Sequence, residues 1–180
     1  GVLTDLGGPS ANMYGMKGRN QDLCSKCTRY SCIHPNHCKN LDSNHHPLIE
    51  LYKKVNELPY LKHAYIGSGI RYDLFTQSNG GREYFRRVVT KHVSGRLKVA
   101  PEHTSEKVLK TMRKPSFAMF VQIKKDFDTI CREAKMNQQL IPYFISSHPS
   151  CTLSDMAELA VKMKEMGYRL EQIQDFTPTP

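Results

Sequence analysis

The sequence contains no apolar run near the ~18 residues needed to cross a bilayer. Near its start it has no basic segment followed by an apolar one, so no secretion signal is recognised. These two absences predict a cytoplasmic chain with no membrane partner. Low-complexity tracts are also missing, and apolar residues make up 39% against 24% charged, which excludes a disordered protein and predicts a globular one.

Acidic residues are in the minority. Lys and Arg total 26 against 17 Asp and Glu, a formal net charge of +9. This balance favours anionic partners such as nucleic acid, phosphates or a carboxylate substrate. The alternative is a truncated piece of a larger protein whose remainder carries the balancing acids, and we expect both ends of the chain to be internal cuts.

Short apolar runs alternate with amphipathic stretches along the chain. The apolar runs predict strands at residues 2–6, 63–66, 97–100, 140–145 and 172–176. Apolar spacings of three and four predict helices at residues 47–58, 82–93, 117–136 and 153–166. This alternation is typical of a parallel sheet, either doubly wound or a (β/α) barrel, and no Gly-x-Gly-x-x-Gly turn supports the dinucleotide-binding version. We predict one α/β domain over residues 1–180, with a long Cys-rich loop at residues 7–46 and alternating helix/strand units over 47–180.

Chemically distinctive residues follow the predicted strands, whereas the loops that return from helix to strand carry nothing comparable. In barrels and open α/β sheets the carboxyl ends of the strands hold the site. We therefore predict that one face of the sheet gathers a set of cofactor-binding residues: Gly7, Gly8, Arg71, Glu102 and His148.

Two of these residues have plainer alternatives. Arg71 has the fork geometry to clamp a carboxylate, but it could equally form an ordinary ion pair with Asp73 in its own loop. Glu102 is placed to accept hydrogen bonds from ribose hydroxyls or an amino group, and with His103 it could act as an acid–base pair. The alternative is that both side chains are solvated while Thr104 caps the next helix.

Four cysteines lie within fifteen residues, which is close enough to reach one metal at little loop-closure cost. They are Cys24, Cys27, Cys32 and Cys38. Without a secretion signal this cluster favours metal over disulfides, either zinc or an iron–sulfur cluster, and His34 or His37 could replace one ligand. Free thiols and adventitious disulfides are the alternatives.

Several long motifs resemble those of the uncharacterised YgiQ-like radical S-adenosylmethionine (SAM) proteins, and the resemblance covers essentially the whole chain. The motifs span residues 5–14 (DLGGPSANMY), 69–73 (GIRYD), 100–104 (APEHT) and 139–146 (QLIPYFIS). Residues 97–113 also resemble, more loosely, the methylthiotransferases that modify transfer RNA.

The resemblance implies a partial (β/α) barrel of the radical SAM type that binds a four-iron four-sulfur cluster and SAM. With an electron donor, such an enzyme generates a 5′-deoxyadenosyl radical that attacks a substrate. By similarity, Gly7 and Gly8 approach the methionine part of SAM, Glu102 contacts ribose or methionine, and residues 145–149 touch adenine. Pro9 stands where many such enzymes have Glu, which leaves the amino-group contact without its usual partner.

The chain also departs from the family pattern. The Cys-x3-Cys-x2-Cys motif that ligates the radical-forming cluster is absent. We expect that motif upstream of Gly1, which makes the Cys24–Cys38 group a second site, and we expect the fragment alone to be inactive. The substrate is unknown, and an anionic molecule or an RNA is a candidate. The rival interpretations of the chain are a metal-stabilised nucleic-acid-binding module and a metal-independent lyase.

Overall fold

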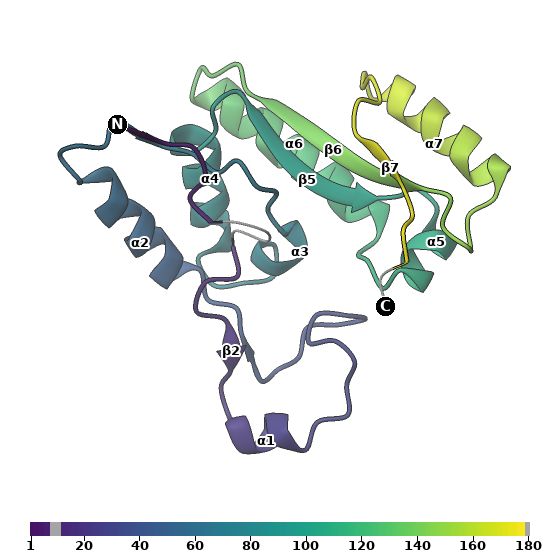
Figure 1. Cartoon of the computed structure of the whole chain (residues 1–180), viewed down its shortest axis with the longest axis horizontal. Coiled ribbons are helices and arrows are strands. Elements are labelled where there is room, and N and C mark those ends of the chain that lie inside the picture. The colour runs from purple at the N-terminus through teal and green to yellow at the C-terminus, as the bar shows by residue number, and fades with distance from the viewer. Residues whose placement is uncertain (8–11, 179–180) are drawn as a thin grey trace.

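The computed structural model describes residues 1–7 and 12–178 (Figure 1). Of the predicted cofactor-binding residues, Gly8 lies outside these ranges, as does the neighbouring Pro9. The described chain is a mixed α/β structure whose longest strands are parallel, so the predicted α/β class with a parallel sheet is confirmed.

The parallel strands form two sheets. One pairs β1 (Val2–Leu3) with β4 (His63–Ala64), and the other has the order β5 (Arg96–Glu102), β6 (Gln139–Ser146) and β7 (Ile173–Asp175). A single parallel bridge joins Ile70, in the segment that follows β4, to Val99 of β5. No pairing in the described ranges joins β7 back to β1. Both parallel sheets are therefore open, with no closed barrel and no reversal of strand order among the described strands.

Helices alternate with the parallel strands along the chain. They are α2 (His46–Asn56), α3 (Tyr72–Phe75), α4 (Gly81–Lys91), α5 (Glu106–Thr111), α6 (Phe117–Glu133) and α7 (Leu153–Glu165). Figure 1 shows α6 behind β5 and β6, with α4 beside the start of β5. Burial alternates along β5, so Leu97 and Val99 join the core with residues of these helices, whereas Lys98 is exposed. No helix in the described part of the chain is long and apolar enough to cross a membrane.

The sequence pattern located the main helices to within a few residues, and the capping box that opens α7 is present, with Thr152 and Asp155 bonding each other's backbone N–H. The short helix α3 and a small hairpin were not predicted. The hairpin pairs β2 (Lys17–Gly18) with β3 (Leu41–Asp42) in antiparallel register. Two-residue strands are too short to show a periodicity, so these strands leave no signal in the sequence.

The hairpin closes the base of the Cys-rich loop. Between its strands lies α1 (Gln21–Ser25), which is capped by the Asn20 side chain. Asn40 binds Asn20 twice, accepting from its N–H at 2.9 Å and donating to its carbonyl at 2.8 Å. In Figure 1 the loop forms a separate lobe below the sheet, with its 30–38 segment extending toward the region where β5 and β7 end.

Candidate functional site

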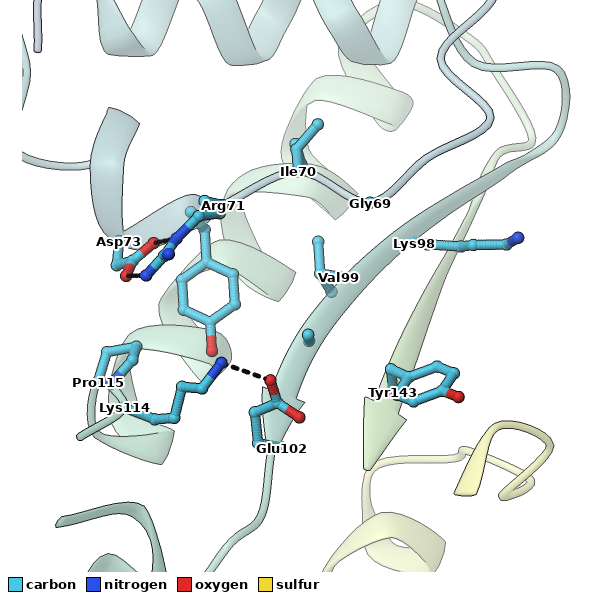
Figure 2. Close-up of a pocket in the computed structure, with 12 residues that line it drawn as sticks. Gly69, Ile70, Arg71, Asp73, Lys98, Val99, Glu102, Lys114, Pro115 and Tyr143 are labelled. Atoms are coloured by element: carbon cyan, nitrogen blue, oxygen red, sulfur yellow. Dashed lines mark hydrogen bonds and ion pairs between the residues drawn. The ribbon is translucent and has the colours of Figure 1, made fainter. Parts of the chain in front are cut away.

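A cavity of about 380 Å³ lies beside β5, where this strand approaches its carboxyl end. Figure 2 shows that Arg71 lines it from the start of α3 and Glu102 from the end of β5. Ile70, Val99 and Tyr143 add apolar wall. The structure thus brings together two of the predicted cofactor-binding residues, whose positions are 31 apart in the sequence.

Glu102 is aimed into the cavity by an irregularity of its strand. The register between β5 and β6 shifts between Val99 and Glu102, and a shift of this kind redirects side chains beside active sites. The backbone of Glu102 is left-handed, with φ 67°, which costs a non-glycine residue ~1–3 kcal/mol. Its side chain is 9% exposed and accepts a charge-assisted hydrogen bond from Lys114 Nζ at 2.7 Å.

Arg71 forms the ion pair with Asp73 that the sequence left as an alternative to a ligand clamp. Nε and Nη2 donate to the two carboxylate oxygens at 3.1 and 2.6 Å, and this contact raises the pKa of Arg71. Two of the five guanidinium N–H donors are used in this way. The other three have no hydrogen-bond partner among the described residues, so Arg71 retains donors for a ligand.

Asn12 holds Arg71 in place, although sequence reasoning gave it no role. Its Oδ1 accepts from the Arg71 N–H at 2.7 Å and its Nδ2 donates to the Arg71 carbonyl at 2.8 Å. Asn12 is fully buried, and Nδ2 also lies 3.3 Å from His45 Nε2. Burial lowers the pKa of His45, and its Nδ1–H bonds to the Ser43 carbonyl, so the neutral ring presents Nε2 as an acceptor to Asn12. The only signal in the sequence was the motif that contains Asn12.

Gly7 follows the extended segment that continues β1, but it does not line the cavity. The Leu6 N–H donates to the Tyr65 carbonyl at 2.6 Å, which carries the β1–β4 pairing on toward Gly7. Beside it, Asp5 accepts from the N–H groups of Gly67 and Ser68 at 3.0 and 3.2 Å. A Cβ on Gly67 would lie 3.0 Å from a backbone oxygen, so glycine permits this close approach.

His148 lies apart from the Arg71–Glu102 cavity and is not among its lining residues. It is buried, its Nδ1 lies 2.8 Å from Ser150 Oγ, and its ring packs edge-on against Phe176 with centroids 4.8 Å apart. The carboxyl-end rule therefore placed three residues after strands but did not specify which of them share a cavity.

His103 also faces away from the cavity and contacts Cys151, with Nε2 and Sγ 3.3 Å apart. The Ser105 N–H donates to His103 Nδ1 at 2.9 Å, so the neutral ring carries its proton on Nε2 and donates toward the sulfur. Burial lowers the pKa of His103 and raises the pKa of Cys151. The pair is therefore not an activated nucleophile, and Glu102 and His103 do not face one cavity as an acid–base pair.

The four cysteines of the loop do not form a metal site in the described structure. Cys24, Cys27 and Cys32 are exposed and Cys38 is half-buried, all as free thiols. Within residues 1–7 and 12–178, no three His, Cys, Asp or Glu side chains lie close enough to hold a metal ion. Local turns bring their backbones near, since the Cys27 N–H bonds the Cys24 carbonyl at 3.1 Å and the Cys38 N–H bonds the Cys32 carbonyl at 2.7 Å. The loop must rearrange before the thiols can gather around zinc or iron. Metal binding by the four cysteines therefore stays a prediction.

The fold and the cavity together define an α/β protein with a ligand-sized cavity at the carboxyl edge of a parallel sheet. A UPF0313 protein of Bacteroides thetaiotaomicron is 58% identical over 187 residues, covering 100% of this chain and 30% of that protein. YgiQ of Escherichia coli, also a UPF0313 protein, is 42% identical over 180 residues, covering 100% of the chain and 24% of its own length. The chain therefore belongs to the UPF0313 family, which includes YgiQ.

A UPF0313 protein of Porphyromonas gingivalis is likewise 51% identical over the whole chain. The chain spans less than a third of the curated relatives it matches, 30% of the Bacteroides protein and 24% of YgiQ. No family model matches the sequence, and no solved structure matches it.

Proposed function

We propose that the chain is the SAM-binding part of a radical SAM enzyme and that its parallel sheets are segments of a partial (β/α) barrel. The observation that carries the proposal is the convergence of Arg71 and Glu102 on one cavity at the carboxyl edge. The order of the strands supports it, because within each of the two sheets the neighbours are successive parallel strands of the chain, as a barrel requires. A doubly wound sheet reverses its order at a switch point.

The residues around the cavity fit SAM by their chemistry. The Glu102 carboxylate can accept hydrogen bonds from ribose hydroxyls or an ammonium group, and the free N–H groups of Arg71 can donate to a carboxylate. Ile70, Val99 and Tyr143 offer apolar surface of the kind that an adenine ring packs against. The left-handed backbone at Glu102 is further support, because such strain is concentrated at functional sites.

These residues bind and orient the cofactor. When bound, the four-iron four-sulfur cluster and SAM supply the radical chemistry, and the protein contributes position and electrostatics. Lys114 Nζ pairs with Glu102 Oε1 across 2.7 Å, which fixes the carboxylate in the cavity wall. Asn12 fixes the backbone of Arg71, and Asp73 fixes its side chain.

The test uses a protein of the relatives' full length that contains this chain, reconstituted anaerobically with iron, sulfide and dithionite. We expect it to form 5′-deoxyadenosine from SAM, measured by chromatography. Glu102→Ala should weaken SAM binding about tenfold, the effect of losing one charged hydrogen bond, and should lower the yield. The matched control is Glu57→Ala, an exposed residue that lies outside the cavity. Equal loss in both variants, or no 5′-deoxyadenosine at all, would refute the proposal.

A further inference from the structure

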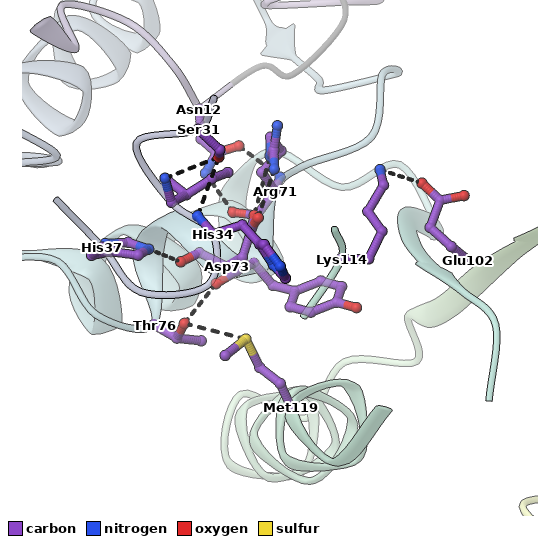
Figure 3. Close-up of polar contacts among 12 residues, drawn as sticks. Asn12, Ser31, His34, His37, Arg71, Asp73, Thr76, Glu102, Lys114 and Met119 are labelled. Atoms are coloured by element: carbon purple, nitrogen blue, oxygen red, sulfur yellow. Dashed lines mark hydrogen bonds and ion pairs between the residues drawn. The ribbon is translucent and has the colours of Figure 1, made fainter. Parts of the chain in front are cut away.

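A second cavity, of about 490 Å³, lies between the tip of the Cys-rich loop and the connection from α5 to α6. It shares Asp73, Lys114 and Pro115 with the Arg71–Glu102 cavity, so the two are neighbours across these residues. Figure 3 shows His34 and His37 approaching Asp73 from the loop, with Lys114 and Glu102 on the other side of it. We call this space the loop cavity.

The loop cavity has cations without anionic partners. Three basic side chains line it, and of these only Lys114 has an ion pair in the described part of the chain, with Glu102. Lys110 and Arg113 have none there. Both acidic side chains on its wall are already engaged. Asp73 is held by Arg71, and Glu106 accepts the Phe117 N–H at 3.0 Å.

The helix end of α5 sets the position of Arg113. The backbone of Arg113 is left-handed, with φ 56°, and Arg113 occupies the position after a helix that usually carries glycine. The Lys114 N–H bonds the Leu109 carbonyl at 2.9 Å and the Arg113 N–H bonds the Lys110 carbonyl at 3.1 Å, which together form a Schellman motif. Arg113 and Lys114 are therefore presented by a rigid turn.

The Cys-rich loop is docked on this wall by two contacts. His37 Nε2 donates to the Asp73 carbonyl at 2.8 Å, so this nitrogen carries a proton. The Arg113 guanidinium stacks over the Tyr30 ring, 5.0 Å from its centroid. Ser31 Oγ accepts the His34 N–H at 3.1 Å and shapes the turn that brings His34 into the wall.

We propose that the loop cavity binds a phosphate group of the small-molecule substrate. A phosphate offers up to two negative charges and several acceptor oxygens to the unpaired Lys110 and Arg113, and a guanidinium fork matches it bidentately. Binding there places the rest of the substrate beside Asp73 and Lys114, at the border of the Arg71–Glu102 cavity. The assignment of the phosphate to a substrate rests on the proposed function, whereas the binding itself does not.

The test titrates the 180-residue chain with inorganic phosphate, followed by ³¹P NMR, without SAM or iron. We expect saturable binding that falls as salt is added, because the contact is electrostatic. Lys110→Gln combined with Arg113→Asn should weaken it at least about tenfold. Asn is chosen at position 113 because it tolerates a left-handed backbone. The matched control, Lys125→Gln with Arg132→Gln on the exposed side of α6, removes the same charge outside the cavity and should bind as the parent does.

Three results would overturn the inference. No saturation up to about 10 mM phosphate would mean that the cavity has no anion site. Equal weakening in both double variants would indicate only the general positive charge. Tight binding of a single-stranded RNA oligomer that the control variant also weakens would make the surface a nucleic-acid contact. Thermal unfolding of each variant verifies folding, and because Glu102 is unchanged, failure here is separate from failure of SAM cleavage.

Discussion

The pairing of Lys114 with Glu102 gives the sharpest prediction of stability. The Glu102 side chain is 9% exposed and Lys114 is 36% exposed, with 2.7 Å between Nζ and Oε1. Lys114→Met leaves a nearly buried carboxylate without its cation. Removing one partner of a fully buried pair costs ~3–5 kcal/mol, and because Lys114 is about one-third exposed we expect ~2 kcal/mol. For a chain of this size, ~2 kcal/mol lowers the melting temperature by about 4–8 °C.

Glu102→Gln should cost less than about 1 kcal/mol, because the amide oxygen still accepts from Lys114 and the ammonium can turn to water. The double variant should therefore be more stable than Lys114→Met alone. Calorimetry of the four proteins, parent included, measures this asymmetry as a double-mutant cycle. Two results would contradict this reasoning: equal losses in the free energy of unfolding for the two single variants, or a loss below about 0.5 kcal/mol for Lys114→Met. Either would show that water reaches the ion pair and that Glu102 is not buried in the cavity wall.

Three further sets of substitutions test the account, two from contacts in the structure and one from the spacing of the cysteines. Asn12→Ala should cost ~2–3 kcal/mol in urea unfolding, because two backbone groups lose their partner. Thr152→Ala removes the cap of α7 and should cost ~1 kcal/mol. Hydrogen bonds from Thr152 hold the pKa of Asp155 well below its usual range, so this stabilisation is present above about pH 4 and is lost as pH falls toward the folded-state pKa. Protein purified anaerobically should carry about one zinc, or cluster iron, per chain, and Cys27→Ser with Cys32→Ser should release it.

Each of these predictions has a control. Asn137 is exposed, and Asn137→Ala should leave unfolding unchanged. Asp155→Asn should reduce the loss of stability that occurs as the pH falls below about 4. An unchanged pH dependence would contradict its assignment to Asp155. Cys151→Ser should retain the metal, because Cys151 lies against His103 and outside the loop. Elemental analysis below about 0.2 metal per chain would mean that the loop cysteines are free thiols.

The helices were predictable because apolar residues recur at spacings of three and four along their buried faces. The residues at spacings of three and four in α6, such as Phe120, Ile123 and Phe127, are the ones that the core covers. The carboxyl-end rule likewise predicted that Arg71 and Glu102 lie on one face, and the two residues line one cavity; their role in binding a cofactor stays a prediction. Strand order, however, depends on which neighbours pair, and no local pattern encodes that.

The rest of the site depends on contacts between distant residues. Asn12 is 59 positions from Arg71, and a single Asn in a loop has no periodicity that predicts its partner. His37 contacts Asp73 across 36 positions because the Cys-rich loop folds back, which its composition did not indicate. The cysteine spacing suggested a metal centre, whereas the docking of the loop tip beside the cavity became visible only in three dimensions.

A crystal structure of a relatives-length protein with SAM bound tests the central claim most directly. The account predicts SAM density in the cavity between Arg71, Glu102 and Tyr143, with a SAM polar group within hydrogen-bond distance of the Glu102 carboxylate. SAM bound elsewhere, with this cavity filled only by water, would contradict the assignment of the carboxyl edge as the cofactor site.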